Sequence, residues 1–142
     1  MYLILLAEDN PGDVRLFREA LNARGLAYEL ILAEDGDQAL RLISETTTPL
    51  PKPPDVIVLD INLPKHNGDE VLRRSRSIPN WAAIPVIVLT SSESPADKTK
   101  VLQNGASLYL RKPSDLSGLA EIGGAVEAML KAPRTPAASE RK

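Results

Sequence analysis

Apolar and polar positions follow one another along this chain in two recurring patterns. Short continuous apolar runs bounded by turn signals indicate strands buried on both faces, whereas apolar residues repeating every three or four positions indicate helices. The first pattern predicts five strands, at residues 2–7, 28–33, 56–59, 84–90 and 107–111. The second predicts that a helix follows each strand, at about residues 11–24, 37–43, 69–77, 95–103 and 115–130.

Residues suited to helix ends support these boundaries. Asn10 is placed as an N-cap, with Pro11 at the first helical position and Gly25 as a C-terminal stop. Ser94 and Pro95 form the same kind of start for the fourth helix. Strands and helices that alternate in this way, joined by right-handed crossovers, predict an α/β fold with a parallel sheet covered by helices on both faces.

Two segments depart from the alternation. Residues 46–54 contain four prolines, which predicts an extended surface loop. Residues 132–142 have nothing to bury and are predicted to be a disordered tail. We therefore expect one folded domain at residues 1–131.

The composition narrows the class of protein. A length of 142 residues with 43% hydrophobic and 25% charged residues is typical of a single soluble domain. The formal net charge of −2 gives no general attraction to nucleic acid or to an anionic membrane. The absence of cysteine excludes disulfides, thiolate zinc sites and a cysteine nucleophile, and it fits a cytoplasmic protein. The apolar run at residues 2–7 is too short for a signal peptide or a membrane span.

Polar side chains follow four of the predicted strands. Glu8 and Asp9 come directly after the first strand, and Asp60 comes directly after the third. Thr90 ends the fourth strand, and Lys112 follows the fifth. Because the carboxyl ends of parallel strands meet at one edge of the sheet, where such folds bind ligands, we expect these side chains to converge.

The converging groups indicate phosphoryl transfer. Three carboxylates beside one ammonium leave an excess of negative charge that raises a pKa or recruits a cation, and all-oxygen ligands suit Mg²⁺. A metal, a hydroxyl and an ammonium around a carboxylate nucleophile are the groups needed to move a phosphoryl group onto Asp60, with the cation and Lys112 offsetting the phosphoryl charge. Each residue alone would more often be a solvated side chain, so the interpretation depends on the whole set.

The sequence around these strand ends resembles the four signature blocks of response-regulator receiver domains from two-component signalling. The blocks are Glu8-Asp9-Asn10, Leu59-Asp60-Ile61-Asn62-Leu63-Pro64 with Gly68, Leu89-Thr90-Ser91, and Leu110-Arg111-Lys112-Pro113. The resemblance extends from about Leu3 to Leu130. It implies a flavodoxin-like receiver domain at residues 1–131, with five helices around a parallel sheet in the order 2-1-3-4-5.

The resemblance also implies how phosphate is accepted. Asp60 would take a phosphoryl group from a sensor histidine kinase in a Mg²⁺-dependent reaction. Glu8, Asp9 and Asp60 would hold the metal, Glu8 partly through water, and Asn62 would add its backbone carbonyl. The domain would assist its own phosphorylation and dephosphorylation without being an enzyme.

The same resemblance implies how phosphorylation is sensed. Thr90 would bond the phosphoryl group and Lys112 would pair with it, with a cis peptide between Lys112 and Pro113. Tyr109 falls at the position of the switch aromatic, which turns inward when Thr90 moves toward the phosphate.

A finer resemblance is to stand-alone receivers paired with phytochrome histidine kinases of bacteria and cyanobacteria. These share the Glu-Asp-Asn-Pro-x-Asp start, an insert with prolines before the third strand, and Asn62-Leu63-Pro64 after the aspartate. No DNA-binding or catalytic module follows Leu130, so we expect output through contacts with an unidentified downstream protein. The fourth helix, the fifth strand and the last helix form the expected output surface, and family likeness makes them a homodimer surface as well.

Three other classes of protein fit this sequence less well. A metal-dependent phosphohydrolase with an aspartyl-phosphate intermediate typically has a second Asp two residues after the nucleophile, where this chain has Asn62. A flavin-binding module would need a Ser- and Thr-rich phosphate loop after the first strand, where this chain has acidic residues. A receiver-fold binding module that is not phosphorylated would not need the complete acceptor set.

Four other conspicuous residues have simpler interpretations. His66 lies in a predicted turn and is expected to be a solvated loop residue, not a relay histidine or a metal ligand. Trp81 is expected to be a partly buried loop anchor, not a partner contact. Lys98 and Lys100 are expected to lie on the solvent face of their helix.

Overall fold

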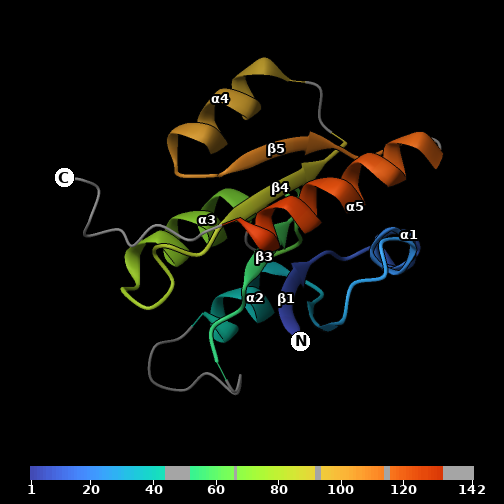
Figure 1. Cartoon of the computed structure of the whole chain (residues 1–142). Helices are drawn as coiled ribbons and strands as arrows, with labels where there is room; N and C mark the ends of the chain where they lie inside the picture. The colour runs from blue at the N-terminus through green and yellow to red at the C-terminus, as the bar shows by residue number, and fades with distance from the viewer. Residues whose placement is uncertain (44–51, 66, 92–93, 114–115, 133–142) are drawn as a thin grey trace.

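The five strands and five helices alternate along the chain in the predicted order in the computed structural model (Figure 1). The structure describes residues 1–43, 52–65, 67–91, 94–113 and 116–132. The strands are β1 (Tyr2–Ala7), β2 (Tyr28–Ala33), β3 (Val56–Leu59), β4 (Val86–Thr90) and β5 (Leu108–Arg111). The helices are α1 (Pro11–Ala23), α2 (Gly36–Leu42), α3 (Gly68–Ser77), α4 (Pro95–Gln103) and α5 (Leu116–Lys131).

All five strands run parallel in one sheet, in the order β2-β1-β3-β4-β5. The predicted order is therefore confirmed. The central strand is β3, and all four of its residues are buried. Ala7 at the end of β1 pairs with Leu59 at the end of β3, so these two strands end at the same level of the sheet.

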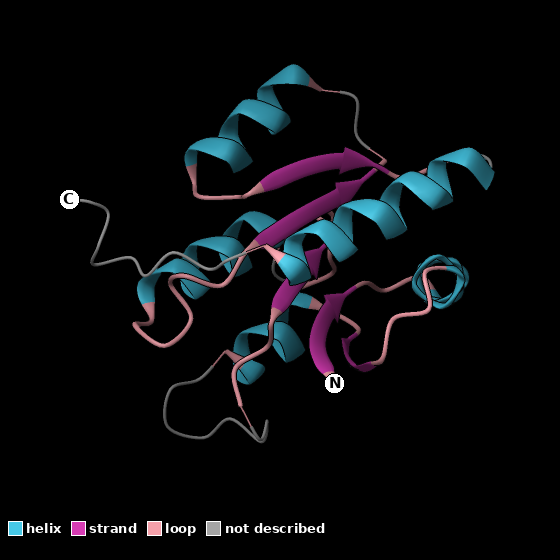
Figure 2. Ribbon diagram, in the orientation of Figure 1, coloured by secondary structure: helices cyan, strands magenta, loops and turns pink. Residues whose placement is uncertain are grey.

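Helices cover both faces of the sheet (Figure 2). α1 and α5 pack against each other over one face, and α2, α3 and α4 lie over the other. Successive residues of a strand point to opposite faces, and β1 shows the consequence. Ile4 and Leu6 belong to the core under α1 and α5, whereas Leu5 and Ala7 belong to the core under α2 and α3. The continuous apolar runs in the sequence thus fill two separate cores.

The first helix begins and ends as predicted. The Oδ1 atom of Asn10 accepts hydrogen bonds from the backbone N–H groups of Gly12 and Asp13, at 2.8 and 3.1 Å, and α1 starts at Pro11. Gly25, two residues past the helix, has φ +69°, a left-handed conformation that glycine adopts without steric cost. The Asn10 cap fixes the first turn of α1 close to the end of β1.

Two polar side chains of α3 bond to neighbouring segments of the chain. Asp69 contacts the end of α4, and Arg76 contacts the backbone just before β4 and just after α4. The buried carboxylate of Asp69 accepts a hydrogen bond from Asn104 and lies 3.5 Å from Nζ of Lys100. The guanidinium of Arg76 donates hydrogen bonds of 2.6 Å to the backbone carbonyls of Ile84 and Gly105. Burial lowers the pKa of Arg76, and the carbonyl bonds satisfy donors that would otherwise be buried unpaired.

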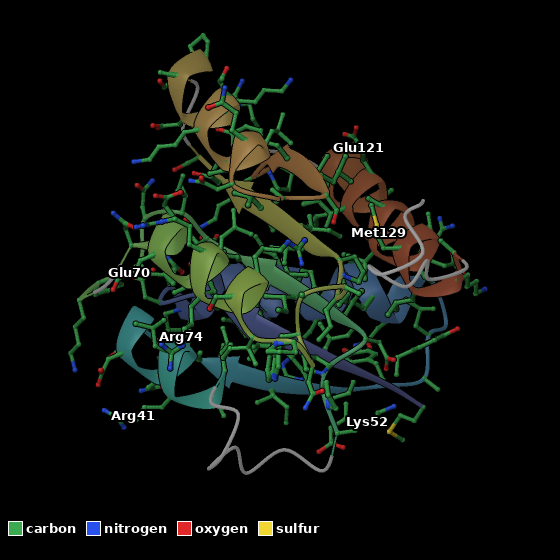
Figure 3. All side chains as sticks on the ribbon, turned by 90° about the vertical axis from the view of Figure 1, so that its left-hand side faces the viewer. Arg41, Lys52, Glu70, Arg74, Glu121 and Met129 are labelled. Carbon is green, nitrogen blue, oxygen red and sulfur yellow. The ribbon has the colours of Figure 1, made fainter. Side chains whose placement is uncertain are left out.

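The surface confirms some simpler predictions and corrects one. Lys98 and Lys100 are exposed, as predicted. Charged side chains of α2 and α3, among them Arg41 and Arg74, lie on the outer surface (Figure 3). Trp81 is only 2% exposed, so it is a core residue and is buried more deeply than predicted.

Several sequence predictions fall on segments outside the described residues. They concern most of the proline-rich loop, at residues 46–51, the single histidine His66, and the tail at 133–142. Among the helices that the structure describes, none has the length and apolar character needed to span a membrane.

Candidate functional site

Glu8 and Asp60 lie side by side because β1 and β3 end at the same level. The backbone N–H of Asp60 donates a 3.0 Å hydrogen bond to the carbonyl of Ala7, so the pairing continues one residue beyond the strands. Glu8 is 3% exposed and Asp60 is 5% exposed. A buried carboxylate is costly unless it is hydrogen-bonded or paired with a cation, so the groups around these two residues determine the chemistry of the site.

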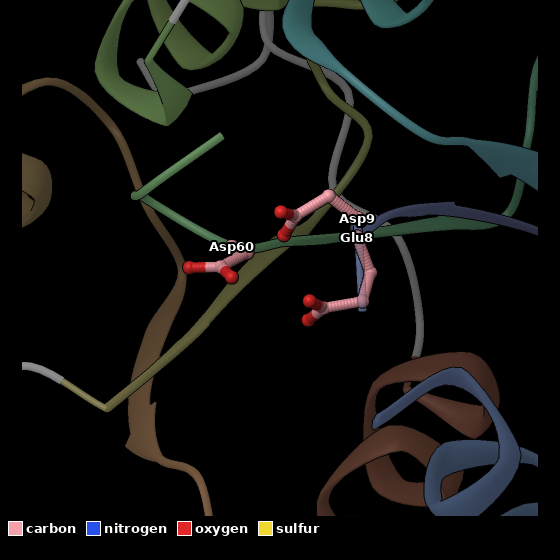
Figure 4. A group of neighbouring side chains, drawn as sticks. All are labelled: Glu8, Asp9 and Asp60. Atoms are coloured by element: carbon pink, nitrogen blue, oxygen red, sulfur yellow. The ribbon is translucent and has the colours of Figure 1, made fainter. Parts of the chain in front are cut away.

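Asp9 completes a group of three carboxylates (Figure 4). One oxygen from each of Glu8, Asp9 and Asp60 lies within 4.8 Å of the others. Octahedral coordination at about 2.1 Å separates ligand oxygens by about 3.0 to 4.2 Å, so small side-chain rotations would bring all three onto one cation. Carboxylate oxygens are ligands that Mg²⁺ and Mn²⁺ prefer. These residues therefore fit a divalent metal.

Lys112 joins the carboxylates from the other side of β4. Its backbone N–H donates to the carbonyl of Thr90 at 2.7 Å, which places the side chain beyond the end of the sheet. The Nζ atom lies 2.9 Å from Oε1 of Glu8, 2.9 Å from Oδ2 of Asp60 and 2.8 Å from Oδ2 of Asp13. One ammonium thus meets three carboxylates, one of which was not predicted to belong to the site.

The peptide between Lys112 and Pro113 corrects an implication of the family resemblance. No cis peptide bond occurs among the described residues, so this bond is trans. For an X–Pro bond the trans isomer is favoured by about 0.5–1 kcal/mol unless tertiary contacts select the cis form. In this structure Lys112 reaches all three carboxylates from the trans form.

The electrostatic environment shifts the pKa of two residues in the site. Burial raises the pKa of Glu8 to about 7, the hydrogen bond from Lys112 opposes this shift, and the charge of Asp60 adds to it. Burial alone would lower the pKa of Lys112, but its hydrogen bonds to carboxylates raise it above the usual value. Lys112 therefore remains charged, while Glu8 takes up a proton more readily than an ordinary glutamate.

Both carboxylate oxygens of Asp60 are held in place. Oδ2 contacts Lys112, and Oδ1 accepts a 3.0 Å hydrogen bond from the backbone N–H of Asn62. The loop after Asp60 closes tightly because the N–H of Gly68 donates to the carbonyl of Ile61 at 2.8 Å. A Cβ atom at Gly68 would lie 2.5 Å from the backbone oxygen of Asp60, so only glycine allows α3 to begin this close to the acceptor.

The two predicted switch residues lie on adjacent strands. Thr90 ends β4 and is fully buried. Tyr109 pairs with Val88 of β4 and is half-buried against the core on the side of α2, α3 and α4. Thr90 therefore lies at the carboxyl end of the sheet, and Tyr109 lies on the neighbouring strand β5.

The structure brings together most of the predicted site and adds one residue to it. Glu8, Asp9, Asp60 and Lys112 converge as predicted. The added residue is Asp13, an acidic residue in the first turn of α1. Its contact with Lys112 could have been anticipated from the position of the helix, because α1 begins at the same edge of the sheet as the carboxylates.

Comparison with known proteins identifies the family. The model of the response regulator receiver domain matches residues 4–122. Response regulator Rcp1 of Synechocystis sp. is 35% identical over 126 residues, which cover 88% of this chain and 86% of Rcp1. The chain therefore belongs to the response regulator receiver family, and the resemblance in the sequence is confirmed. It is a signalling domain related to Rcp1.

Solved structures of relatives have the same fold as this chain, and two of them carry a bound metal ion or a phosphoryl group. The Mn²⁺-bound form of Rcp1 has a TM-score of 0.82 and 33% identity, covering 96% of this chain and all of that one. Phosphorylated cyanobacterial phytochrome response regulator RcpA has a TM-score of 0.79 and 34% identity, and the match covers 96% of this chain and 99% of RcpA. Bacteriophytochrome response regulator RtBRR has a TM-score of 0.76 and 35% identity, and the match covers 95% of this chain and 81% of RtBRR.

Proposed function

We propose that Asp60 accepts a phosphoryl group from a sensor histidine kinase in a reaction that requires Mg²⁺. The observation that carries this proposal is the fixed, buried carboxylate of Asp60, which has one oxygen on Lys112 and the other on a backbone N–H. Two further carboxylates lie within metal-ligand range of it. The Mn²⁺-bound and phosphorylated relatives support both parts of the proposal.

Each residue of the site contributes a separate effect to the transfer. A carboxylate oxygen of Asp60 forms a bond to phosphorus as the bond from phosphorus to the kinase histidine breaks, and the leaving imidazole takes up a proton from solvent. Glu8, Asp9, Asp60 and the carbonyl of Asn62 would hold Mg²⁺, which offsets charge on the phosphoryl oxygens. Lys112 adds a second positive charge 2.9 Å from Oδ2 of the acceptor. The same groups would assist the later hydrolysis of the acyl phosphate.

The phosphoryl group would be sensed through Thr90 and Tyr109. A phosphoryl group adds charge and strong acceptor oxygens at Asp60, so the hydroxyl of Thr90 would be drawn toward it. Space then opens toward β5, and Tyr109 can exchange an outward rotamer for an inward one. This two-state element would change the surface of α4, β5 and α5, which we assign to a downstream protein and to homodimer formation.

The kinase is proposed to be a phytochrome. Support comes from RcpA and RtBRR, which are named as response regulators of a cyanobacterial phytochrome and of a bacteriophytochrome. Their names describe those proteins, and the assignment of this chain to the same kind of partner is our proposal. Direct DNA binding is not part of it, because the formal net charge of −2 offers no general attraction to nucleic acid.

The proposed function is tested by transfer from a panel of kinases. Phytochrome histidine kinases and unrelated histidine kinases are autophosphorylated with labelled ATP and then mixed with the protein. Label should move to the wild-type protein within seconds from a phytochrome kinase and not to Asp60→Asn. Transfer from an unrelated kinase alone would overturn the phytochrome assignment, and label on Asp60→Asn would overturn the acceptor.

A further inference from the structure

We propose that Asp13 is a positioning residue that holds the Lys112 ammonium over Asp60 during phosphoryl transfer. The inference rests on the proposed function of Asp60 and adds one residue to the machinery. It comes from the contacts of a single ammonium group, which has three N–H donors and no acceptor.

The three carboxylates around Lys112 lie at nearly equal distances from its Nζ atom. The Nζ atom lies 2.9 Å from Glu8, 2.9 Å from Asp60 and 2.8 Å from Asp13. The Lys112 side chain is 16% exposed and that of Asp13 is 34% exposed, so the third pair lies toward solvent. The contact joins the first turn of α1 to the end of β5, across 99 positions of the chain.

The three carboxylates differ in what the reaction demands of them. Glu8 and Asp60 belong to the group whose oxygens lie within 4.8 Å of one another and fit a metal, and Asp60 also becomes the acyl phosphate. Asp13 is not in that group. It is therefore the carboxylate that remains with Lys112 when the other two are engaged.

An anchor of this kind matters because lysine is a flexible side chain with a compact charge. Fixing such a chain in one rotamer costs conformational entropy, and fewer contacts remain to offset that cost when Glu8 and Asp60 are engaged elsewhere. A cavity of about 20 Å³, enough for one water, lies beside Lys112 and Asp13 and is also lined by Leu16 and Phe17. A released ammonium could turn away from Asp60 into solvent.

The competing explanation is that Asp13 only stabilises the start of α1. The helix cap does not depend on its carboxylate, because Asn10 accepts a hydrogen bond from the backbone N–H of Asp13. Asp13→Asn therefore keeps the cap and removes the charge that holds Lys112. Asp13→Glu restores the charge, and the cavity beside it accommodates one added methylene. Glu19→Gln removes one charge from an exposed position of the same helix and serves as the control.

The first measurement is the rate of phosphorylation of Asp60 by acetyl phosphate at saturating donor and Mg²⁺. Asp13→Asn should be slower by about fivefold, because the ammonium is less often in place. Asp13→Glu should recover most of the rate, and Glu19→Gln should match the wild type. The Mg²⁺ dissociation constant is measured for each variant, so that every rate is compared at equal saturation.

The second measurement follows the Lys112 ammonium itself, by ¹⁵N nuclear magnetic resonance of the protein at saturating Mg²⁺, when Glu8 and Asp60 are engaged with the metal. Exchange of its protons with water should be about fivefold faster in Asp13→Asn and close to the wild type in Asp13→Glu. A wild-type rate of phosphorylation in Asp13→Asn overturns the proposal. Slower phosphorylation without faster exchange of the Lys112 ammonium protons overturns it as well. A wild-type protein that takes up no phosphate would instead contradict the proposed function of Asp60.

Discussion

The Nζ atom of Lys112 lies 2.9 Å from Oδ2 of Asp60, although the two residues are 52 positions apart in the sequence. They follow β5 and β3, which are separated in the sheet by β4. The long lysine side chain spans the end of β4 and places its charge beside a buried carboxylate. Under the proposed function, the charge that pairs with Asp60 would also interact with an oxygen of the transferred phosphoryl group.

Mg²⁺ should stabilise the protein through the three-carboxylate group. Ligand that binds only the folded state adds stability by mass action, about 2.7 kcal/mol at a concentration 100 times the dissociation constant. The melting temperature should therefore rise with Mg²⁺ concentration, and Asp9→Ala should remove most of that rise. Calorimetry or thermal denaturation followed by circular dichroism measures the effect.

Glu19→Ala is the matched control for the metal experiment. It removes one carboxylate from an exposed position of α1, outside the group that fits a metal. Its melting temperature should respond to Mg²⁺ as the wild type does. An undiminished response in Asp9→Ala would show that the metal binds elsewhere.

The affinity for Mg²⁺ should depend on pH because of Glu8. Burial raises the pKa of this carboxyl from 4.5 to about 7, with Lys112 and Asp60 as the charged groups that face it. Metal binds the ionised form, so affinity should fall roughly tenfold per pH unit below about pH 7 and level off above it. Isothermal titration calorimetry between pH 5.5 and pH 8.5, roughly the range that spans this pKa, measures the slope.

The stability of the metal-free protein should change with pH in the opposite direction. A carboxyl whose pKa is raised by folding favours the folded state when it is protonated. The contribution of Glu8 is therefore greatest below the unfolded pKa of 4.5 and is lost as the pH rises through about 7. In Glu8→Gln both this loss and the pH dependence of metal affinity should disappear. An Mg²⁺ affinity that is the same at pH 6 and pH 8, one unit to each side, would contradict the assignment.

Two adjacent glycines of α5 should respond oppositely to alanine. A Cβ atom at Gly123 would lie 2.6 Å from the backbone oxygen of Ala20 in α1, whereas the nearest atoms to a Cβ at Gly124 are 3.9 Å away. Gly123→Ala should therefore force α1 and α5 apart and cost about 1–3 kcal/mol. Gly124→Ala should stabilise the helix by about 0.5–1 kcal/mol. Chemical denaturation measures both, and equal effects would contradict the close approach of the helices.

Substitutions at the two proposed switch residues should leave phosphorylation intact and weaken the change in binding that follows it. Thr90→Ala and Tyr109→Ala should still be phosphorylated at Asp60, because the three carboxylates that fit the metal and the Lys112 contact with Asp60 are unchanged in both variants. Thr90→Ala should fail to change self-association or partner binding on activation, and Tyr109→Ala should respond weakly. Binding is titrated with and without beryllofluoride, which mimics an acyl phosphate. Full responses in both variants would mean that phosphorylation of Asp60 alters the binding surface through residues other than Thr90 and Tyr109.

The order of the elements and most of the site could be predicted because each depended on local sequence. The apolar run before Asp60 predicts a buried strand, and a carboxylate directly after such a strand must lie at the edge of the sheet. Glu8 and Thr90 follow the same rule. The pairing of Ala7 with Leu59 then aligns the ends of β1 and β3.

Other features depend on contacts between distant parts of the chain. The pair of Asp13 with Lys112 requires the first turn of α1 to lie beside the end of β5. The deep burial of Trp81 depends on how the segment after α3 packs, and its backbone N–H and carbonyl bond to Ile78 and Ile84. The isomer of the bond before Pro113 is likewise set by tertiary context, and the family resemblance implied the wrong one.

The central claim is that Asp60 is the phosphoacceptor, and chemical mapping of the phosphoryl group tests it most directly. The protein is incubated with acetyl phosphate and Mg²⁺, treated with labelled borohydride, which reduces an acyl phosphate to an alcohol, and digested for peptide mass spectrometry. The account predicts label at residue 60 alone, dependent on Mg²⁺ and absent from Asp60→Asn. Label at another carboxylate, or a phosphoryl group that resists borohydride and persists in Asp60→Asn, would contradict it.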